Sequence, residues 1–173
     1  MRETRLFREK IKTADEIFSL AEGWREAGKK IVFTAGWFDP FHVSHVRHLR
    51  RSRPLGNVLV VGIFSDDSFS GKEGDVLPLV DQNGRSMIVA AIECVEFVTT
   101  IAVDEVDKFF IALKPDIYTV GSEISAVPAV VTALHEEFAA MKAASCGAKL
   151  VATGAEVPSI QELYSMIDTR IKP

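Results

Sequence analysis

The chain has few of the features that mark secreted, membrane-spanning or nucleic-acid-binding proteins. Only two of its 173 residues are cysteine, Cys94 and Cys146, and their spacing matches no metal site, so we expect reduced thiols and a cytoplasmic location. No apolar run approaches the roughly 20 residues of a membrane span. The charged amino terminus lacks an apolar signal core. The net charge of -4 argues against a general binder of nucleic acid or anionic membrane.

Internal repeats, low-complexity tracts and a glycine-rich dinucleotide fingerprint are also missing from the sequence. Apolar residues make up 47% of the chain and charged residues 25%, an ordinary globular balance. The length suits one domain with a real core. We therefore expect a single domain over residues 1–173, with residues 1–28 as a leading helical segment packed on it.

Apolar runs alternate with helical patterns along the chain. The runs predict five strands, at residues 30–35, 58–63, 95–99, 116–120 and 148–152. Helices are expected from the capping box at Thr13 to Gly28, then at 43–53, 85–93, 104–113 and 128–145, and from a second capping box at Ser159. This order predicts an α/β fold, a Rossmann-like, doubly wound, five-stranded parallel sheet with helices on both faces.

The most informative segment is TAGWFDPFHVSH at residues 34–45, which joins the first expected strand to the next helix. It places His42 and His45 where the carboxyl end of a strand meets the amino end of a helix. In an open parallel sheet ligands bind in that crevice, and a helix amino end suits phosphate. We expect Val43, Val46 and Leu49 to form the apolar face of this helix.

The pattern F-D-P-x-H-x-x-H, from Phe38 to His45, resembles the motif of the H-x-G-H nucleotidyltransferases, a cytidylyltransferase-like family. More specifically, the chain resembles the adenylyltransferase domain of ADP-heptose synthase and its relative, glycerol-phosphate cytidylyltransferase. Further residues that carry the resemblance are Gly36, Ser65, Asp66, Arg85, the run 90–95, Pro115 and Asp116.

The resemblance implies an enzyme that moves AMP or CMP from ATP or CTP onto a phosphorylated sugar, polyol or related small molecule and releases pyrophosphate. It implies a Mg²⁺ ion carried by the nucleotide, and a homodimer. Catalysis would be positioning and charge stabilisation. The implied catalytic residues are His42, His45 and Arg85. The implied nucleotide site comprises Thr34, Gly36, Trp37, Phe38, Ser44, Gly121 and Ser159. The implied acceptor site comprises Asp39, Lys72, Leu77 and Val120.

The chain departs from the family pattern at several of these positions. The family usually has asparagine at Ala35, cysteine at Trp37 and glycine at Ser44. An Arg-Pro pair is usual where Leu77-Pro78 stands, and lysine is usual at Val120. These losses fall mainly on the acceptor and phosphate side. They leave open an alternative, a nucleotide-binding protein of the same fold that has lost turnover.

Individual residues also keep alternative roles. The histidine pair could only brace the turn, and Asp39-Pro40 could serve only as a turn former. Arg85 could be a surface residue, and Ser159 is a helix cap in either case. Trp37 fits both core filling and a lid over the base. His48 and His135 are expected on the surface.

Overall fold

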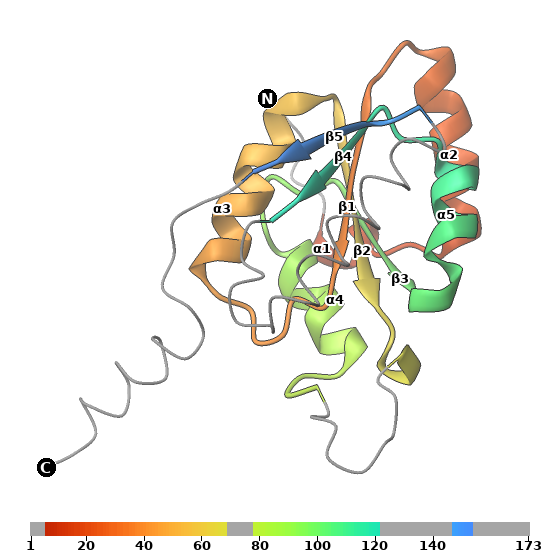
Figure 1. The fold of residues 1–173 in the computed structure, drawn as a ribbon. Helices are drawn as coiled ribbons and strands as arrows, with labels where there is room; N and C mark the ends of the chain where they lie inside the picture. Colours follow the sequence, from red (N-terminus) through yellow and green to blue (C-terminus); the bar gives the residue numbers. More distant parts are fainter. Residues whose placement is uncertain (1–5, 69–77, 122–146, 154–173) are drawn as a thin grey trace, which may run out of the picture.

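The computed structural model describes residues 6–68, 78–121 and 147–153. Its five strands are all parallel and form one sheet in the order β3-β2-β1-β4-β5 (Figure 1). The strands are β1 (Ile31–Gly36), β2 (Val58–Phe64), β3 (Phe97–Ile101), β4 (Ile117–Val120) and β5 (Lys149–Ala152). β1 lies at the centre, and the order reverses there, so the predicted doubly wound parallel sheet is confirmed.

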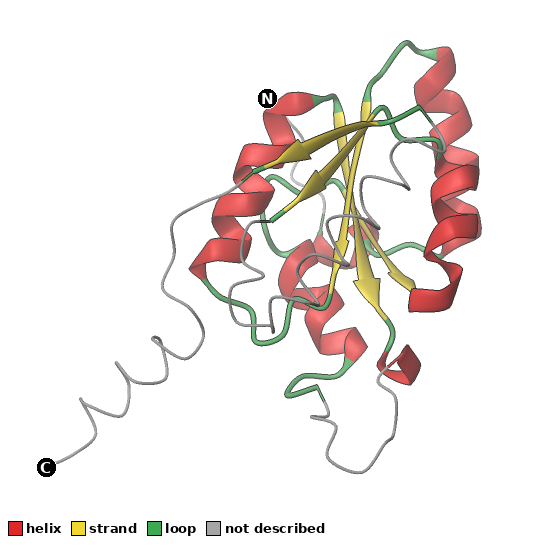
Figure 2. Ribbon diagram, viewed as in Figure 1, coloured by secondary structure: helices red, strands yellow, loops and turns green. Residues whose placement is uncertain are grey.

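Helices cover both faces of the sheet (Figure 2). They are α1 (Phe7–Lys10), α2 (Ala14–Glu26), α3 (Val43–Ser52), α4 (Gln82–Ala90) and α5 (Val106–Leu113), with short 3-10 turns η1 (Arg53–Leu55), η2 (Asp66–Ser68) and η3 (Val103–Glu105). The capping box at Thr13 opens α2, and Gly28 follows its end at a φ of 65°. None of these helices has the length and apolarity needed to cross a bilayer.

The core has two parts because alternate residues of a strand point to opposite faces. Ile31 and Phe33 pack with α2 and α5, whereas Val32 packs with Leu49 of α3 and Val89 of α4. Thr34 follows Val32 on the α3 side and is 2% exposed. This face leads to residues 37–45, which join β1 to the first turn of α3, carry His42 and His45, and are called the histidine turn below.

Several predicted boundaries are wrong by two or three residues, and α4 also ends three residues early, at Ala90. α4 begins three residues before the expected position 85 because the Asp81 carboxylate accepts from the Gly84 N–H at 2.7 Å and caps the helix. β3 begins two residues late because the chain is still turning at Val95, whose N–H donates to Ile92 O at 3.1 Å. The expected helices at 128–145 and after Ser159 lie outside the described residues.

Candidate active site

The turn from β1 to α3 crosses the carboxyl edge of the sheet at its central strand. Phe38 lies in this turn at a φ of 54° and is 5% exposed, so its ring is buried although its backbone is left-handed. Such a conformation costs a non-glycine residue about 1–3 kcal/mol and persists where the surroundings enforce it. A Cβ added at the preceding Gly36 would lie 3.3 Å from the Phe38 ring, so glycine gives this ring its room.

His42 and His45 cap the amino end of α3 with their side chains. His42 Nδ1 accepts from the Ser44 N–H at 3.3 Å, and His45 Nδ1 accepts from the His42 N–H at 3.2 Å. An imidazole nitrogen that accepts a hydrogen bond carries no proton, so the proton of each neutral ring sits on Nε2. The two rings lie 4.1 Å apart between centroids. The turn therefore presents two Nε2–H donors at a helix amino end.

Both rings are neutral at physiological pH. Burial lowers the pKa of His42, and burial together with the charges of His42 and His48 lowers the pKa of His45 to about 3. The cause is visible in the neighbours of His45, whose ring lies 5.1 Å from the Phe38 ring and 5.4 Å from the Phe41 ring. An anion beside these rings would raise both pKa values again. The neutral rings can thus donate hydrogen bonds through Nε2–H, and an adjacent anion would favour their protonated forms.

The expected apolar face of α3 is wrong in part. Val43 is 50% exposed, while Ser44, His48, Leu49 and Ser52 are the buried residues of the helix. His48 is 6% exposed and so is not the surface residue that we expected. Its Nε2 lies 2.8 Å from the hydroxyl of Thr34, which was expected to contact the nucleotide. In the sequence, the three-residue spacing of His42, His45 and His48 could have indicated that His48 lies on the same side of the helix as the pair.

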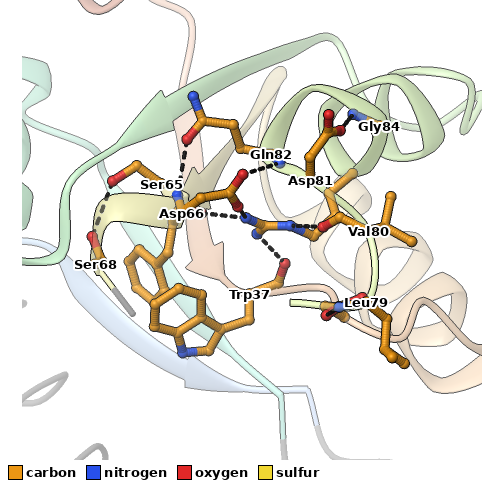
Figure 3. Close-up of polar contacts among 12 residues, drawn as sticks. Trp37, Ser65, Asp66, Ser68, Leu79, Val80, Asp81, Gln82 and Gly84 are labelled. Atoms are coloured by element: carbon orange, nitrogen blue, oxygen red, sulfur yellow. Dashed lines mark hydrogen bonds and ion pairs between the residues drawn. The ribbon is translucent and has the colours of Figure 1, made fainter. Parts of the chain in front are cut away.

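Arg85 is buried, and three of its hydrogen-bond acceptors, on Trp37, Asp66 and Val80, belong to residues labelled in Figure 3. Its guanidinium donates to Val80 O at 2.9 Å, Trp37 O at 2.7 Å, Phe64 O at 2.9 Å and Asp66 Oδ1 at 2.5 Å. We call this cluster the arginine knot. With 1% exposure Arg85 is no surface residue, so that alternative is wrong. The knot ties the carboxyl ends of β1 and β2 to the start of α4.

Two other residues of the turn, Asp39 and Trp37, contact identified neighbours. Asp39 Oδ2 accepts from the Leu79 N–H at 2.6 Å, while its Oδ1 is buried and has no partner among the described residues. The Trp37 ring lies 5.1 Å from the Phe64 ring and packs against the core on the α2 and α5 side. This packing favours core filling for Trp37 over a lid.

Of the remaining predicted site residues, Ser44, Val120 and Gly121 lie within the described ranges. Ser44 is fully buried at the amino end of α3, and its Oγ has no partner in the described part of the chain. Val120 and Gly121 follow one another at the carboxyl end of β4, where Val120 packs partly against the core. The positions of Lys72, Leu77, Ser159 and His135 lie outside the described residues.

A protein-built metal cage is absent from residues 6–68, 78–121 and 147–153, where no three His, Cys, Asp or Glu residues cluster. Mg²⁺ binds readily through phosphate oxygens and water with few protein carboxylates.

Comparison with known proteins identifies the family and supports the fold. The bifunctional proteins HldE of Pelobacter propionicus and Geobacter metallireducens are 39% and 38% identical over 114 residues, which are 66% of this chain and 23% of each relative. The chain thus matches about a quarter of the length of these relatives. A lipopolysaccharide core biosynthesis protein from Thermoplasma volcanium has a similar fold, with a TM-score of 0.53 at 25% identity over 72% of this chain and 96% of its own. The cytidylyltransferase-like family profile matches residues 33–159. This range includes the histidine turn and all described strands apart from the first two residues of β1. The chain therefore belongs to the cytidylyltransferase-like family.

Proposed function

We propose that the protein transfers AMP or CMP from ATP or CTP to a phosphorylated sugar, polyol or related small molecule. The observation that carries the proposal is the pair of Nε2–H donors that His42 and His45 present at the amino end of α3. Two such donors beside a helix dipole match the oxygens of a triphosphate. Membership of the family and similarity to HldE, an ADP-heptose synthase, support the same reaction class.

In the proposed reaction an oxygen of the acceptor's phosphate attacks the α-phosphorus in line. A new P–O bond forms as the bond from the α-phosphorus to the bridging oxygen breaks, and that electron pair leaves with pyrophosphate. Mg²⁺ on the phosphates would offset part of their negative charge. His42 and His45 hold the triphosphate through Nε2–H and stabilise the charge that develops during transfer. Because their Nδ1 atoms are held by backbone N–H groups, the donors are oriented before the nucleotide binds.

One observation favours the alternative function, a nucleotide-binding protein without turnover. This observation is the arginine knot. Four of the five N–H groups of Arg85 already bond to protein atoms, so in this conformation the guanidinium has little left for the leaving phosphates. The missing lysine at Val120 points in the same direction. The reaction nevertheless remains the preferred function because the histidine pair is complete.

The test is pyrophosphate release with ATP and with CTP against a panel of phosphorylated polyols and sugars, including heptose and glycerol phosphates. We expect release that requires one nucleotide, one acceptor and Mg²⁺. The replacement His42→Asn serves as the matched control because asparagine also caps helices. Nucleotide binding without release for any acceptor would favour the alternative. Absence of both binding and release would contradict the nucleotide site itself.

A further inference from the structure

A chain of hydrogen bonds runs through the interior from β1 to the end of β5. Thr34 lies on β1, His48 on α3, and Thr153 directly after β5, and all three are less than 10% exposed. Thr34 Oγ1 lies 2.8 Å from His48 Nε2, and Thr153 Oγ1 is hydrogen-bonded to His48 Nδ1. Thr153 Oγ1 also bonds to Val120 O at 3.2 Å. Residues 105 positions apart in sequence thus meet on one imidazole.

The direction of each bond follows from chemistry. Val120 O can only accept, so the single proton of the Thr153 hydroxyl goes to it, and Thr153 Oγ1 accepts from His48 Nδ1–H. Burial lowers the pKa of His48 to about 4, so the ring is neutral at physiological pH and its other nitrogen, Nε2, is an acceptor. Thr34 therefore donates to His48 Nε2. His48 holds the opposite tautomer to His42 and His45.

The next turn of α3 bonds to the same edge of the sheet. Ser52 Oγ lies 2.8 Å from Thr119 Oγ1 of β4, and Arg51 donates to Thr153 O at 3.0 Å. Apolar packing alone would allow α3 to rotate or slide, whereas several directional bonds define one position. His45 and His48 are three residues apart on this helix, so they share a side of it.

We infer that His48 is a positioning residue for the site: by bonding Thr34 and Thr153 it fixes the rotation of α3, and with it the direction in which His42 and His45 present their Nε2–H donors. The inference rests on the proposed function only for its effect on turnover. The same contacts connect Thr34 near the end of β1 with Thr153, which directly follows β5.

The test compares variants that remove one bond at a time. His48→Phe removes both bonds at similar size, His48→Asn keeps a donor near the Nδ1 position, and His48→Gln keeps an acceptor near Nε2. Thr153→Val removes one hydroxyl without changing the size of the side chain, which covers the case in which His48→Phe does not fold. Val89→Ala, a buried change on α4 outside the hydrogen-bond chain, controls for simple loss of stability.

The first readout needs no activity. Imidazole ¹⁵N spectra of the wild type should show His42 and His45 as single Nε2–H tautomers. Thr153→Val and His48→Phe should convert them to mixed tautomers or broaden their signals, whereas Val89→Ala should not. If both His48-chain variants fold and leave these signals unchanged, the inference is overturned, whether or not the protein proves to be a transferase.

The second readout applies once a substrate pair is known. We expect His48→Phe and Thr153→Val to lower kcat by about 10–100-fold, since a displacement of about 1 Å can cost that much, while KM for the nucleotide changes by less than about 3-fold. His48→Asn should recover part of the loss. A kcat equal to that of the wild type in folded Thr153→Val and His48→Phe would overturn the positioning role. If the wild type itself releases no pyrophosphate, the proposed function fails and the spectra alone decide this inference.

Discussion

The two polar clusters that flank the turn after β1 differ in how they handle charge. On one side, the rings of His42 and His45 are neutral, and each keeps its Nδ1 on a backbone N–H. On the other side, the cationic Arg85 donates four hydrogen bonds, one to the Asp66 carboxylate and three to backbone carbonyls. The Asp66 side chain is 33% exposed, and its Oδ2 also accepts from the Gln82 N–H at 2.9 Å. Arg85 thus uses its donors to connect parts of the fold, whereas the histidine pair is oriented by hydrogen bonds at Nδ1.

The largest expected effect comes from breaking the arginine knot. Arg85→Ala leaves the carbonyls of Trp37, Phe64 and Val80 without their donor and Asp66 without its cation. An unsatisfied buried acceptor costs about 1–3 kcal/mol, so urea unfolding should show a loss of several kcal/mol or no folded protein. Arg85→Lys, which keeps the charge but not the planar fork, should still lose most of this stability. A folded Arg85→Ala of normal stability that fails only in turnover would instead assign Arg85 to the phosphates.

Substitutions of His42 and His45 should have the opposite result: a small change in stability and a large loss of turnover. His42→Asn keeps a helix-capping side chain but removes Nε2–H, so we expect stability within about 1 kcal/mol of the wild type and turnover lowered by at least ~10²-fold. His45→Ala should lose a similar factor. Nucleotide affinity, measured by calorimetry, should fall less than turnover. Near-normal turnover in both variants on a confirmed substrate would refute the catalytic assignment.

Acid should destabilise the part of the fold that contains His45 and His48. The pKa values of His45 and His48 in the folded chain, about 3 and about 4, lie below the ordinary value of 6.5. The unfolded chain therefore binds more protons as the pH falls below about 6.5, and stability is lost progressively toward pH 4 at up to about 1.4 kcal/mol per pH unit for each ring. Urea titrations across this range should show a shallower pH dependence for His48→Phe than for the wild type. Equal slopes would contradict a neutral buried His48.

The smallest effect is expected at Val120 and Leu77, two positions of the predicted acceptor site. Val120→Lys restores the lysine usual in the family, and one charge-assisted hydrogen bond is worth about 1.5 kcal/mol at the lower end. KM for heptose phosphate or glycerol phosphate should then improve by about tenfold, with Leu77→Arg adding to it. The unmodified chain should use either compound poorly. Efficient turnover of one of them by the wild type would show that other residues hold its phosphate.

The parallel sheet and the histidine turn could be predicted from the sequence, whereas the roles of His48 and Arg85 depend on tertiary contacts. Strand periodicity and the order of elements gave the parallel sheet, and the histidine turn was found because its residues are contiguous. His48 was misjudged because its partners, Thr34 and Thr153, come from distant strands. The burial of Arg85 was equally hidden, since three of its acceptors are backbone carbonyls, which every residue possesses.

The central claim is that nucleotide phosphates meet the Nε2–H donors of His42 and His45 at the amino end of α3. The direct measurement is an imidazole ¹⁵N titration of the wild type with Mg·ATP and with Mg·CTP at neutral pH. The account predicts neutral Nε2–H tautomers without nucleotide, and a saturable shift of both Nε2 signals with at least one nucleotide, accompanied by higher pKa values. Nucleotide binding that leaves both rings unchanged, or rings protonated on Nδ1 from the start, would contradict it.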